Sequence, residues 1–480
     1  MNHPLIDLSR RRWLKMSGLS ACGALSAGTL GSLLVPTAAR AADYKALVCV
    51  FLYGGNDGLN TIVPTDSARY TPYHDVRLSL ALPSSSLLPL SGTNYGLHPA
   101  LAALQSAWAG KRLAPLFNVG PLKAPLTKAA YREAAGDPSK VPGNLFSHSD
   151  QQALWETGTA SSLTRTGWGG RAAEALATTN PVISAGGNAR FGLSASTGPL
   201  VVPEPGAVFG TYELGSEPWR LQDVPATARA NAIRALYTQA QDSGLRDAHA
   251  RMQRDAFEVT QRLGAIVKTQ PGDANANAAI NAGFAPVTSG GRITTPLAKQ
   301  LYQVAKLIAD RATVQGDRQI FFVQLGGFDT HGGQVSSDPT QGVHARLLKQ
   351  VGDAMAAFDN AMQNLGMGAA VTQFTQSDFG RTFKPNGSSG TDHAWGNHQL
   401  VLGGAVKGGS TYGTYPTLEL GGADDVGVDP WELHGRWIPT SSVDQYAATL
   451  LRWFGAADAQ LDAVLPNLVN FGAARSLGFV

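Results

Sequence analysis

Three short apolar segments end in the same way, and this shared pattern constrains the fold more than any other feature. ALVCVFLYGGNDG, QIFFVQLGGFDTHGG and AAVTQFTQSDFG each run into small or polar residues and then an aspartate, namely Asp57, Asp329 and Asp378. Continuous apolar runs of this length are typical of strands buried on both faces of a parallel sheet. Because ligands bind at the carboxyl ends of such strands, we predict that the three carboxylates share one edge of a sheet.

Histidines occur near these aspartates at spacings suited to a metal ion. His331 follows Asp329 by two residues, so both side chains point the same way in an extended segment. The segment GTDHAWGNHQ adds Asp392, His393 and His398. Gathered carboxylates raise one another's pKa values, and a metal ion removes this repulsion. We therefore predict a divalent metal site that uses all of these residues, with zinc favoured and Mn, Fe, Mg or Ca as alternatives.

Candidate catalytic side chains lie in two further segments. NLFSHSDQQALWETG places Ser147 and His148 directly before a helix-like run. A serine there is either a helix cap or a nucleophile activated by a metal and the helix dipole. Arg381, three residues after Asp378, is a candidate for binding an anionic substrate, with a surface salt bridge as the alternative.

The first 41 residues have the features of an export signal. SRRRWLK resembles a twin-arginine motif, an apolar stretch follows, and Ala39-Arg40-Ala41 fits a small-residue cleavage site. We expect the twin-arginine translocon to export the folded chain to the periplasm or beyond the cell. The expected mature chain, residues 42–480, then has no stable transmembrane segment.

Charge and cysteine content exclude some classes of protein. The 41-residue segment carries +4 and the whole chain +3, so the remaining residues carry −1. A basic surface for nucleic acid is therefore not expected. Only Cys49 remains after cleavage, inside an apolar run, so we expect a buried thiol and no internal disulfide.

The remaining segments fit one large α/β domain over residues 42–480. Residues 98–119 read as a helix and then a strand. Residues 225–315 are rich in Ala and Gln with helical spacing, and we interpret them as a helical insertion or cap beside the site. Residues 441–455 predict a core helix that is capped by Ser442 and ended by Gly455.

Several motifs together resemble a family of exported bacterial proteins, domain of unknown function 1501. They are FLYGGNDGLNTIVP, FSHSDQQALWETG, LGGFDTHGGQ, SDFGRT, GTDHAWGNHQLVLGGAVKGG and GRWIPTSSVDQYAATLLRWFG. Members of this family resemble the alkaline phosphatase and sulfatase superfamily. The resemblance implies a three-layer α/β sandwich with a mostly parallel sheet and one or two metals at the strand ends. In this chain Phe379, not a histidine, follows Asp378, and the next Asp-His pair is Asp392-His393.

These observations predict an exported metal-dependent hydrolase that acts on a phosphate or sulfate ester, either a small molecule or a group linked to a polymer. The alternative is a degenerate, non-catalytic member of the family that acts as an exported binding or assembly protein. The aspartates and histidines at the strand ends favour the enzyme, whereas the missing Asp-His pair at residues 378–379 favours the alternative.

Overall fold

The three predicted strands form the middle of one large sheet. The computed structural model describes residues 44–134, 136–210, 224–239 and 243–480. Strand β1 (Lys45–Leu52) pairs in parallel with β10 (Arg318–Leu325) on one side and with β11 (Val371–Ser377) on the other. Leu52 is in register with both Leu325 and Ser377, so the three strands end at the same level. The predicted common edge is therefore present.

Five further strands complete this eight-stranded sheet, which has the order β13-β5-β12-β11-β1-β10-β6-β7. Only β12 runs antiparallel to its neighbours β11 and β5, and every other pairing in this sheet is parallel. The sheet is thus mostly parallel, as the continuous apolar runs predicted. The added strands are β5 (Leu113–Gly120), β6 (Ile183–Ser184), β7 (Leu200–Val201), β12 (Asn397–Gly403) and β13 (Ser441–Ser442).

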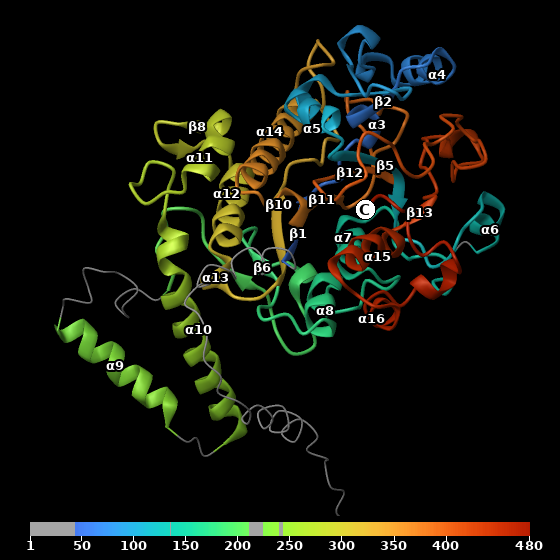
Figure 1. Cartoon of the computed structure of the whole chain (residues 1–480). Coiled ribbons are helices and arrows are strands. Elements are labelled where there is room, and N and C mark those ends of the chain that lie inside the picture. Colours follow the sequence, from blue (N-terminus) through green and yellow to red (C-terminus); the bar gives the residue numbers. More distant parts are fainter. Residues whose placement is uncertain (1–43, 135, 211–223, 240–242) are drawn as a thin grey trace, which may run out of the picture. The chain divides into compact units, whose positions relative to one another are not determined.

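Helices cover both faces of the sheet, which gives three layers (Figure 1). Alternate residues of β1 enter two different cores: Val48 and Val50 pack with one set of helices, and Leu47, Cys49 and Phe51 with the other. This alternation follows from the two-residue period of a strand. The first face is covered mainly by α12 (Pro296–Ala309) and α14 (Val343–Asn364), and the second by α7 (His148–Thr157), α8 (Trp168–Ala175), α15 (Val443–Phe454) and α16 (Asp458–Val464).

Several local predictions are confirmed. Residues 113–120 form β5, after a 3-10 helix (Pro99–Leu104) and α5 (Gln105–Ala109). The Ser442 side chain caps α15, and Gln445 completes a capping box. Cys49 is buried and free.

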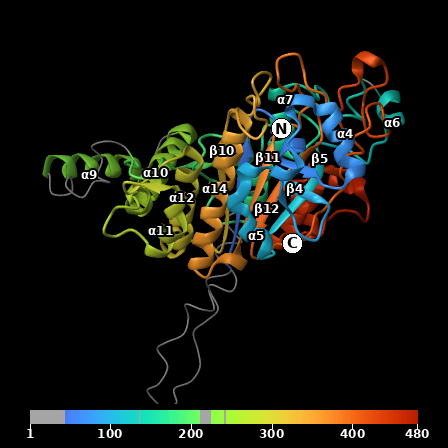
Figure 2. The same cartoon turned by 90° about the horizontal axis from the view of Figure 1, so that it is seen from above.

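In the described part of the segment 225–315, most residues form helices, with a short hairpin among them, and none of these residues belongs to the group of side chains at the sheet edge described below. α12 packs on β10 and α14, and α10 (Gly244–Lys268) packs on both α9 (Val224–Thr238) and α12 (Figure 2). The remaining elements of this segment are α11 (Ala278–Phe284), α13 (Arg311–Val314), β8 (Thr288–Ser289) and β9 (Arg292–Ile293).

Smaller elements follow β1 and β5 along the chain. A three-stranded sheet is formed by β2 (Ile62–Pro64), β3 (Leu88–Pro89) and β4 (Tyr95–Leu97), and the helices are α3 (Gly58–Thr61), α4 (Ser67–Arg77) and α6 (Lys128–Glu133). The predicted export signal lies outside the described residues. Within the part of the chain that the structure describes, no helix combines the length and apolarity needed to cross a bilayer.

Candidate metal centre

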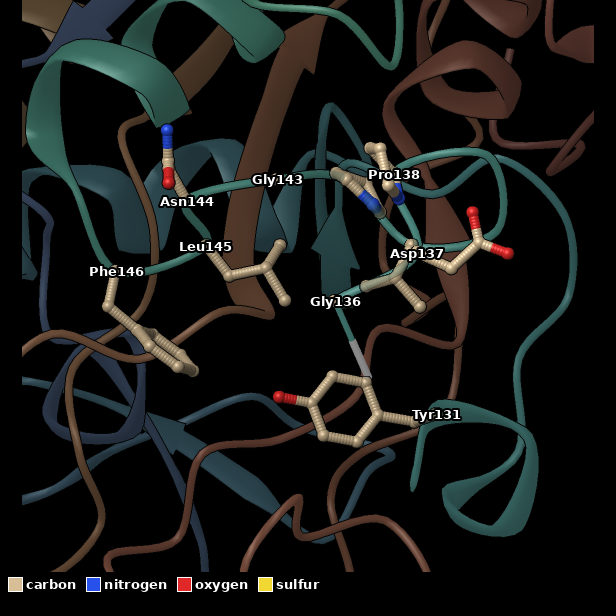
Figure 3. A pocket seen from close by; sticks show the side chains of 10 residues that line it. Tyr131, Gly136, Asp137, Pro138, Gly143, Asn144, Leu145 and Phe146 are labelled. Atoms are coloured by element: carbon tan, nitrogen blue, oxygen red, sulfur yellow. The ribbon is translucent and has the colours of Figure 1, made fainter. Parts of the chain in front are cut away.

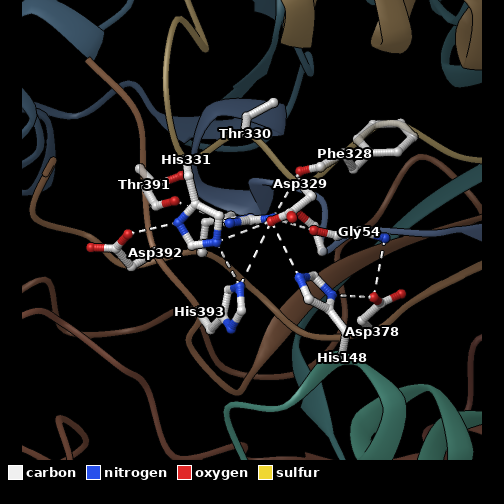
Figure 4. Close-up of polar contacts among 12 residues, drawn as sticks. Gly54, His148, Phe328, Asp329, Thr330, His331, Asp378, Thr391, Asp392 and His393 are labelled. Atoms are coloured by element: carbon white, nitrogen blue, oxygen red, sulfur yellow. Dashed lines mark hydrogen bonds and ion pairs between the residues drawn. The ribbon is translucent and has the colours of Figure 1, made fainter. Parts of the chain in front are cut away.

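Four side chains converge at the carboxyl edge of the large sheet and form a group that could hold a metal ion (Figure 4). His148 is the first residue of α7, Asp329 and His331 lie in the loop after β10, and His393 lies in the loop before β12. One ligand atom from each residue lies within 4.8 Å of the other three. We call these four residues the metal cluster.

The separations inside the metal cluster fit one tetrahedral ion. Asp329 Oδ1 lies 3.2 Å from His148 Nε2, 3.1 Å from His331 Nε2 and 3.7 Å from His393 Nε2. Zinc ligands at about 2.0–2.1 Å in a tetrahedron are about 3.3 Å apart, close to these values. The Nε2 atoms of His331 and His393 are nearer, at 2.7 Å, and need to separate slightly around an ion.

Each histidine of the metal cluster is held at its other ring nitrogen by an acceptor. His148 Nδ1 lies 2.7 Å from Asp378 Oδ2, and His331 Nδ1 lies 2.8 Å from Asp392 Oδ1. His393 Nδ1 lies 2.7 Å from the carbonyl oxygen of Phe146, which can only accept. A neutral ring that donates from Nδ1 presents a lone pair at Nε2, the form that binds metal. The three acceptors therefore prepare three ligands that face one point.

The charges around the metal cluster favour an ionised aspartate and a neutral His393. Burial raises the pKa of the Asp329 carboxyl, but the hydrogen bond and charge of Arg381 and the nearby histidines lower it further, so the net shift is downward. Burial lowers the pKa of His393. The hydrogen bond to Asp378 raises the pKa of His148, so this ring requires the metal to displace its proton.

The metal cluster is open to solvent on one side. The side chains of Asp329 and His331 are 49% and 45% exposed, whereas those of His148 and His393 are 27% and 22% exposed. A small molecule can therefore approach the centre from the side of the loop that follows β10.

Asp378 and Asp392 were predicted as metal ligands, and the structure places both of them behind the histidines. Asp378 is fully buried, and its Oδ2 also accepts from Gln152 Nε2 at 2.8 Å and from the Gly54 amide at 3.1 Å. Asp392 Oδ1 accepts from His331 and from Asn386 Nδ2. Each of these two carboxylates orients one histidine of the metal cluster.

Asp57 was predicted to be a ligand because it follows the first strand, and the structure places it outside the metal cluster. Its carboxylate is completely buried, forms an ion pair with Arg77, and accepts from Gln334 Nε2 at 2.6 Å and from the Asn60 amide. Burial raises the pKa of Asp57, yet Arg77 and the other partners outweigh it and lower the pKa overall. The expected repulsion between Asp57 and the other carboxylates is absent, and Asp57 caps α3.

His398 is also placed elsewhere. It lies on β12, where its Nδ1 accepts from the Asn118 amide at 3.1 Å and its ring contacts Phe117 and Tyr415. Burial lowers the pKa of His398 to about 3, so the ring is neutral. These contacts are those of a core histidine.

Arg381 lies next to the metal cluster, but its side chain has no exposed surface. One amino group donates to Asp329 Oδ1 at 2.6 Å. An anionic substrate could contact this guanidinium only if hydrogen bonds of Arg381 to the protein were broken. In this structure Arg381 therefore fixes Asp329 and does not offer an open anion site. Its remaining hydrogen bonds go to the carbonyl oxygens of Gly54, Gly55, Phe328 and Thr391.

Ser147 is the N-cap residue of α7, although its hydroxyl makes no capping bond to the helix backbone. The hydroxyl donates to Asp150 Oδ2 at 2.8 Å and lies 3.1 Å from Ser149 Oγ. It therefore points toward the first turn of its own helix. His148, which was predicted to be catalytic, belongs to the metal cluster.

Arg436 is a further cation near the centre that the sequence did not indicate. Its guanidinium stacks over the Phe146 ring, 4.5 Å from the ring centre, and its Nε donates to the His393 carbonyl oxygen at 3.0 Å. Within the described part of the chain, Nε is the only guanidinium nitrogen of Arg436 that donates a hydrogen bond. Arg436 is thus the better placed of the two arginines to meet an anion.

Comparison with known proteins gives a family but no activity. A family model described as "Protein of unknown function (DUF1501)" matches residues 44–450. No curated protein matches the chain. A crystal structure of Ps i-CgsB in complex with k-i-k-neocarrahexaose aligns at 11% identity and a TM-score of 0.35, covering 89% of this chain and 77% of that chain. A second structure of Ps i-CgsB aligns at 12% identity and a TM-score of 0.33 over the same shares. Structural likeness at this level carries no inference about function. The family model, in contrast, spans most of the described chain, and the protein therefore belongs to the DUF1501 family.

Proposed function

We propose that this protein is an exported, metal-dependent hydrolase that cleaves a phosphate or sulfate ester at the metal cluster. One observation carries the proposal: three imidazole Nε2 atoms and one carboxylate oxygen face the same point while each Nδ1 is held by its own acceptor. The ester class rests on the resemblance to the alkaline phosphatase and sulfatase superfamily.

The donor set favours zinc over the other candidate ions. Three imidazoles and one carboxylate suit zinc, and they also suit Mn or Fe, whereas Mg and Ca prefer sites made mainly of oxygen atoms. A bound ion of this kind lowers the pKa of a water molecule and polarises an ester oxygen.

The protein's own residues would then position the reactants. Arg381 holds Asp329 in its ionised form, which is the form of a carboxylate that binds a metal ion. Arg436 can hold an anionic ester oxygen through its terminal amino groups. In this hydrolysis the water oxygen forms a new bond to phosphorus or sulfur and the bond to the ester oxygen breaks. One proton of the water passes to the leaving alcohol, and phosphate or sulfate is the other product. Because the Ser147 hydroxyl donates to Asp150, we assign the attacking group to water.

The non-catalytic alternative also has an observation in its favour. Four protein donors complete a tetrahedral zinc site, and sites of that kind are usually structural, whereas catalytic sites keep a position for water. On this view the chain is an exported binding or assembly protein stabilised by its ion. The half-exposed Asp329 favours the enzyme, because a ligand that faces solvent can be displaced or joined by water.

Activity measurements decide between these functions. The zinc-loaded mature chain, residues 42–480, should hydrolyse at least one of a panel of phosphate and sulfate monoesters, and a chelator or His393→Ala should abolish this activity. His74→Ala, which changes an exposed histidine outside the cluster, is the matched control and should retain it. A zinc-loaded chain that is inactive on both ester classes supports the binding protein instead.

The proposed location has a separate test. Replacement of Arg10, Arg11 and Arg12 by lysine should leave the chain in the cytoplasm if the twin-arginine translocon exports it. Export of this triple variant at the normal rate contradicts that route.

A further inference from the structure

A cavity of about 350 Å³ lies in the segment that leads into α7 (Figure 3). Figure 3 shows the side chains of Tyr131, Leu145 and Phe146 pointing into the same space. Val141, Pro138 and Pro142 add apolar surface, and Gly143 leaves one wall without a side chain. We call this cavity the ring pocket. Its size suits a single ring, and aromatic and proline side chains pack well against flat groups.

Phe146 connects the ring pocket to the metal cluster. The Phe146 ring lines the pocket, while its carbonyl oxygen accepts from His393 Nδ1 at 2.7 Å. His148 follows Phe146 by two residues, which places their Cα atoms at most about 7 Å apart. A molecule that spans this distance can contact the centre and the pocket together.

Arg436 contacts one residue of each site, Phe146 in the ring pocket and His393 in the metal cluster. Its guanidinium covers one face of the Phe146 ring, and its Nε is bonded to the main chain of His393. The charge of Arg436 also interacts with Tyr131 in the pocket wall and with Asp392 behind His331. An anionic group at the metal cluster would thus have a cation next to the wall of the ring pocket.

We propose that the ring pocket binds the flat organic group of an aryl ester whose phosphate or sulfate group lies at the metal cluster. This inference rests on the proposed function, and it adds the class of alcohol that the substrate carries. The walls supply apolar and ring contacts to this group, and Arg436 holds the charged end.

Calorimetric titration of the zinc-loaded chain with non-hydrolysable anions tests the proposal. The probes are phenylphosphonate against methylphosphonate, and benzenesulfonate against methanesulfonate. In the pair that binds, the phenyl compound should bind about tenfold more tightly, because the ring buries apolar surface that the methyl group lacks. Equal affinity for phenyl and methyl compounds overturns the ring pocket but leaves the hydrolase proposal intact. Binding of none of the four probes overturns both.

A variant that fills the ring pocket tests whether the preference for phenyl over methyl compounds arises there. A side chain at Gly143 meets no atom within 4 Å of its Cβ, and the backbone there is not in the left-handed region, so Gly143→Trp should be accepted by the fold. This variant should bring the phenyl-to-methyl ratio close to one and leave affinity for the methyl compound unchanged. Gly244→Trp, at an equally open position on α10, is the matched control and should keep the tenfold ratio. Tyr131→Ala, which removes one ring wall, should also lower the ratio. If Gly143→Trp and Tyr131→Ala both keep the tenfold phenyl-to-methyl ratio, the ring pocket does not bind the aryl group.

Discussion

The Nε2 atoms of His331 and His393 lie 2.7 Å apart, although the Nδ1 atom of each ring already has a hydrogen-bond acceptor. If both rings are neutral and donate from Nδ1, two lone pairs face each other across this distance. A cation between them removes the repulsion, and the nearby Asp329 carboxylate supplies a negative charge to the same ion. This relationship is the strongest physical reason for a metal at the edge of the sheet.

Loss of the acceptor behind His148 should weaken the metal site without removing a ligand. In Asp378→Asn the acceptor loses its charge, so His148 is a poorer ligand and is held less firmly. We expect zinc affinity to fall by about 10- to 100-fold, the range typical of such changes. Competition with a chromogenic chelator measures it. Asp353→Asn, at an exposed pair with Lys349, is the control. Unchanged affinity in Asp378→Asn shows that this carboxylate does not support the centre.

Asp57 should matter for stability and not for metal content. Asp57→Asn leaves Arg77 buried without its charge partner, which should lower the free energy of unfolding by about 3–5 kcal/mol. Asp66→Asn is a matched control, because Asp66 also caps a helix and pairs with an arginine, but at a more exposed position. It should cost less than about 1 kcal/mol. Urea unfolding with a chelator present measures both.

The zinc content of the folded Asp57→Asn variant shows whether Asp57 is a metal ligand, as the sequence predicted, or a buried partner of Arg77, as the structure has it. Full zinc content is expected, because the Asp57 carboxylate is bonded to Arg77, Gln334 and Asn60. Loss of zinc from correctly folded protein contradicts this placement of Asp57.

Buried neutral histidines should make the metal-free protein sensitive to acid. Burial lowers the pKa of His98 and His398 to about 3 and that of His344 to about 4, below the value of about 6.5 in an unfolded chain. As the pH falls, the unfolded chain therefore takes up protons that the folded chain does not. Each neutral histidine makes its full contribution to the free energy of unfolding above about pH 6.5, and this contribution is lost as the pH falls toward the folded-state pKa.

A single substitution tests this pH dependence. Each such histidine should lower the free energy of unfolding by about 2 kcal/mol when the pH falls from 7 to 5. In His398→Gln, the free energy of unfolding should therefore fall by about 2 kcal/mol less over this pH range than in the wild-type chain. Urea unfolding between pH 7.5 and 4.5, with a chelator present, gives the comparison. His74→Gln changes an exposed histidine and should leave the profile unchanged. An identical profile in His398→Gln and the wild-type chain would count against a neutral, buried His398.

The sequence predicted the strands that carry the site and their common edge, because both depend on local patterns. Continuous apolar runs identified β1, β10 and β11, and the parallel arrangement then required their ends to meet at one edge. The two-residue spacing of Asp329 and His331 is a local feature, and the structure brings these side chains within 3.1 Å of each other.

The separate roles of the carboxylates depend on tertiary contacts that no local pattern contains. Asp57 and Asp378 follow neighbouring strands in the same way, but α4 places Arg77 against the first, and α7 places His148 and Gln152 against the second. The i, i+4 spacing of His148 and Gln152 was the available signal that one face of α7 meets a single partner. Arg436 comes from a loop after the 3-10 helix Pro430–Glu432 and reaches the site only through folding.

Metal stoichiometry tests the central claim most directly. The protein, purified from the cells that produce it and analysed by elemental mass spectrometry, should contain about one equivalent of a transition metal, with zinc expected. His331→Ala and His393→Ala should lose it, while His74→Ala and His398→Gln should retain it. Equal metal content in all of these proteins, or no metal in the wild-type chain after reloading with zinc, would contradict a metal centre formed by His148, Asp329, His331 and His393.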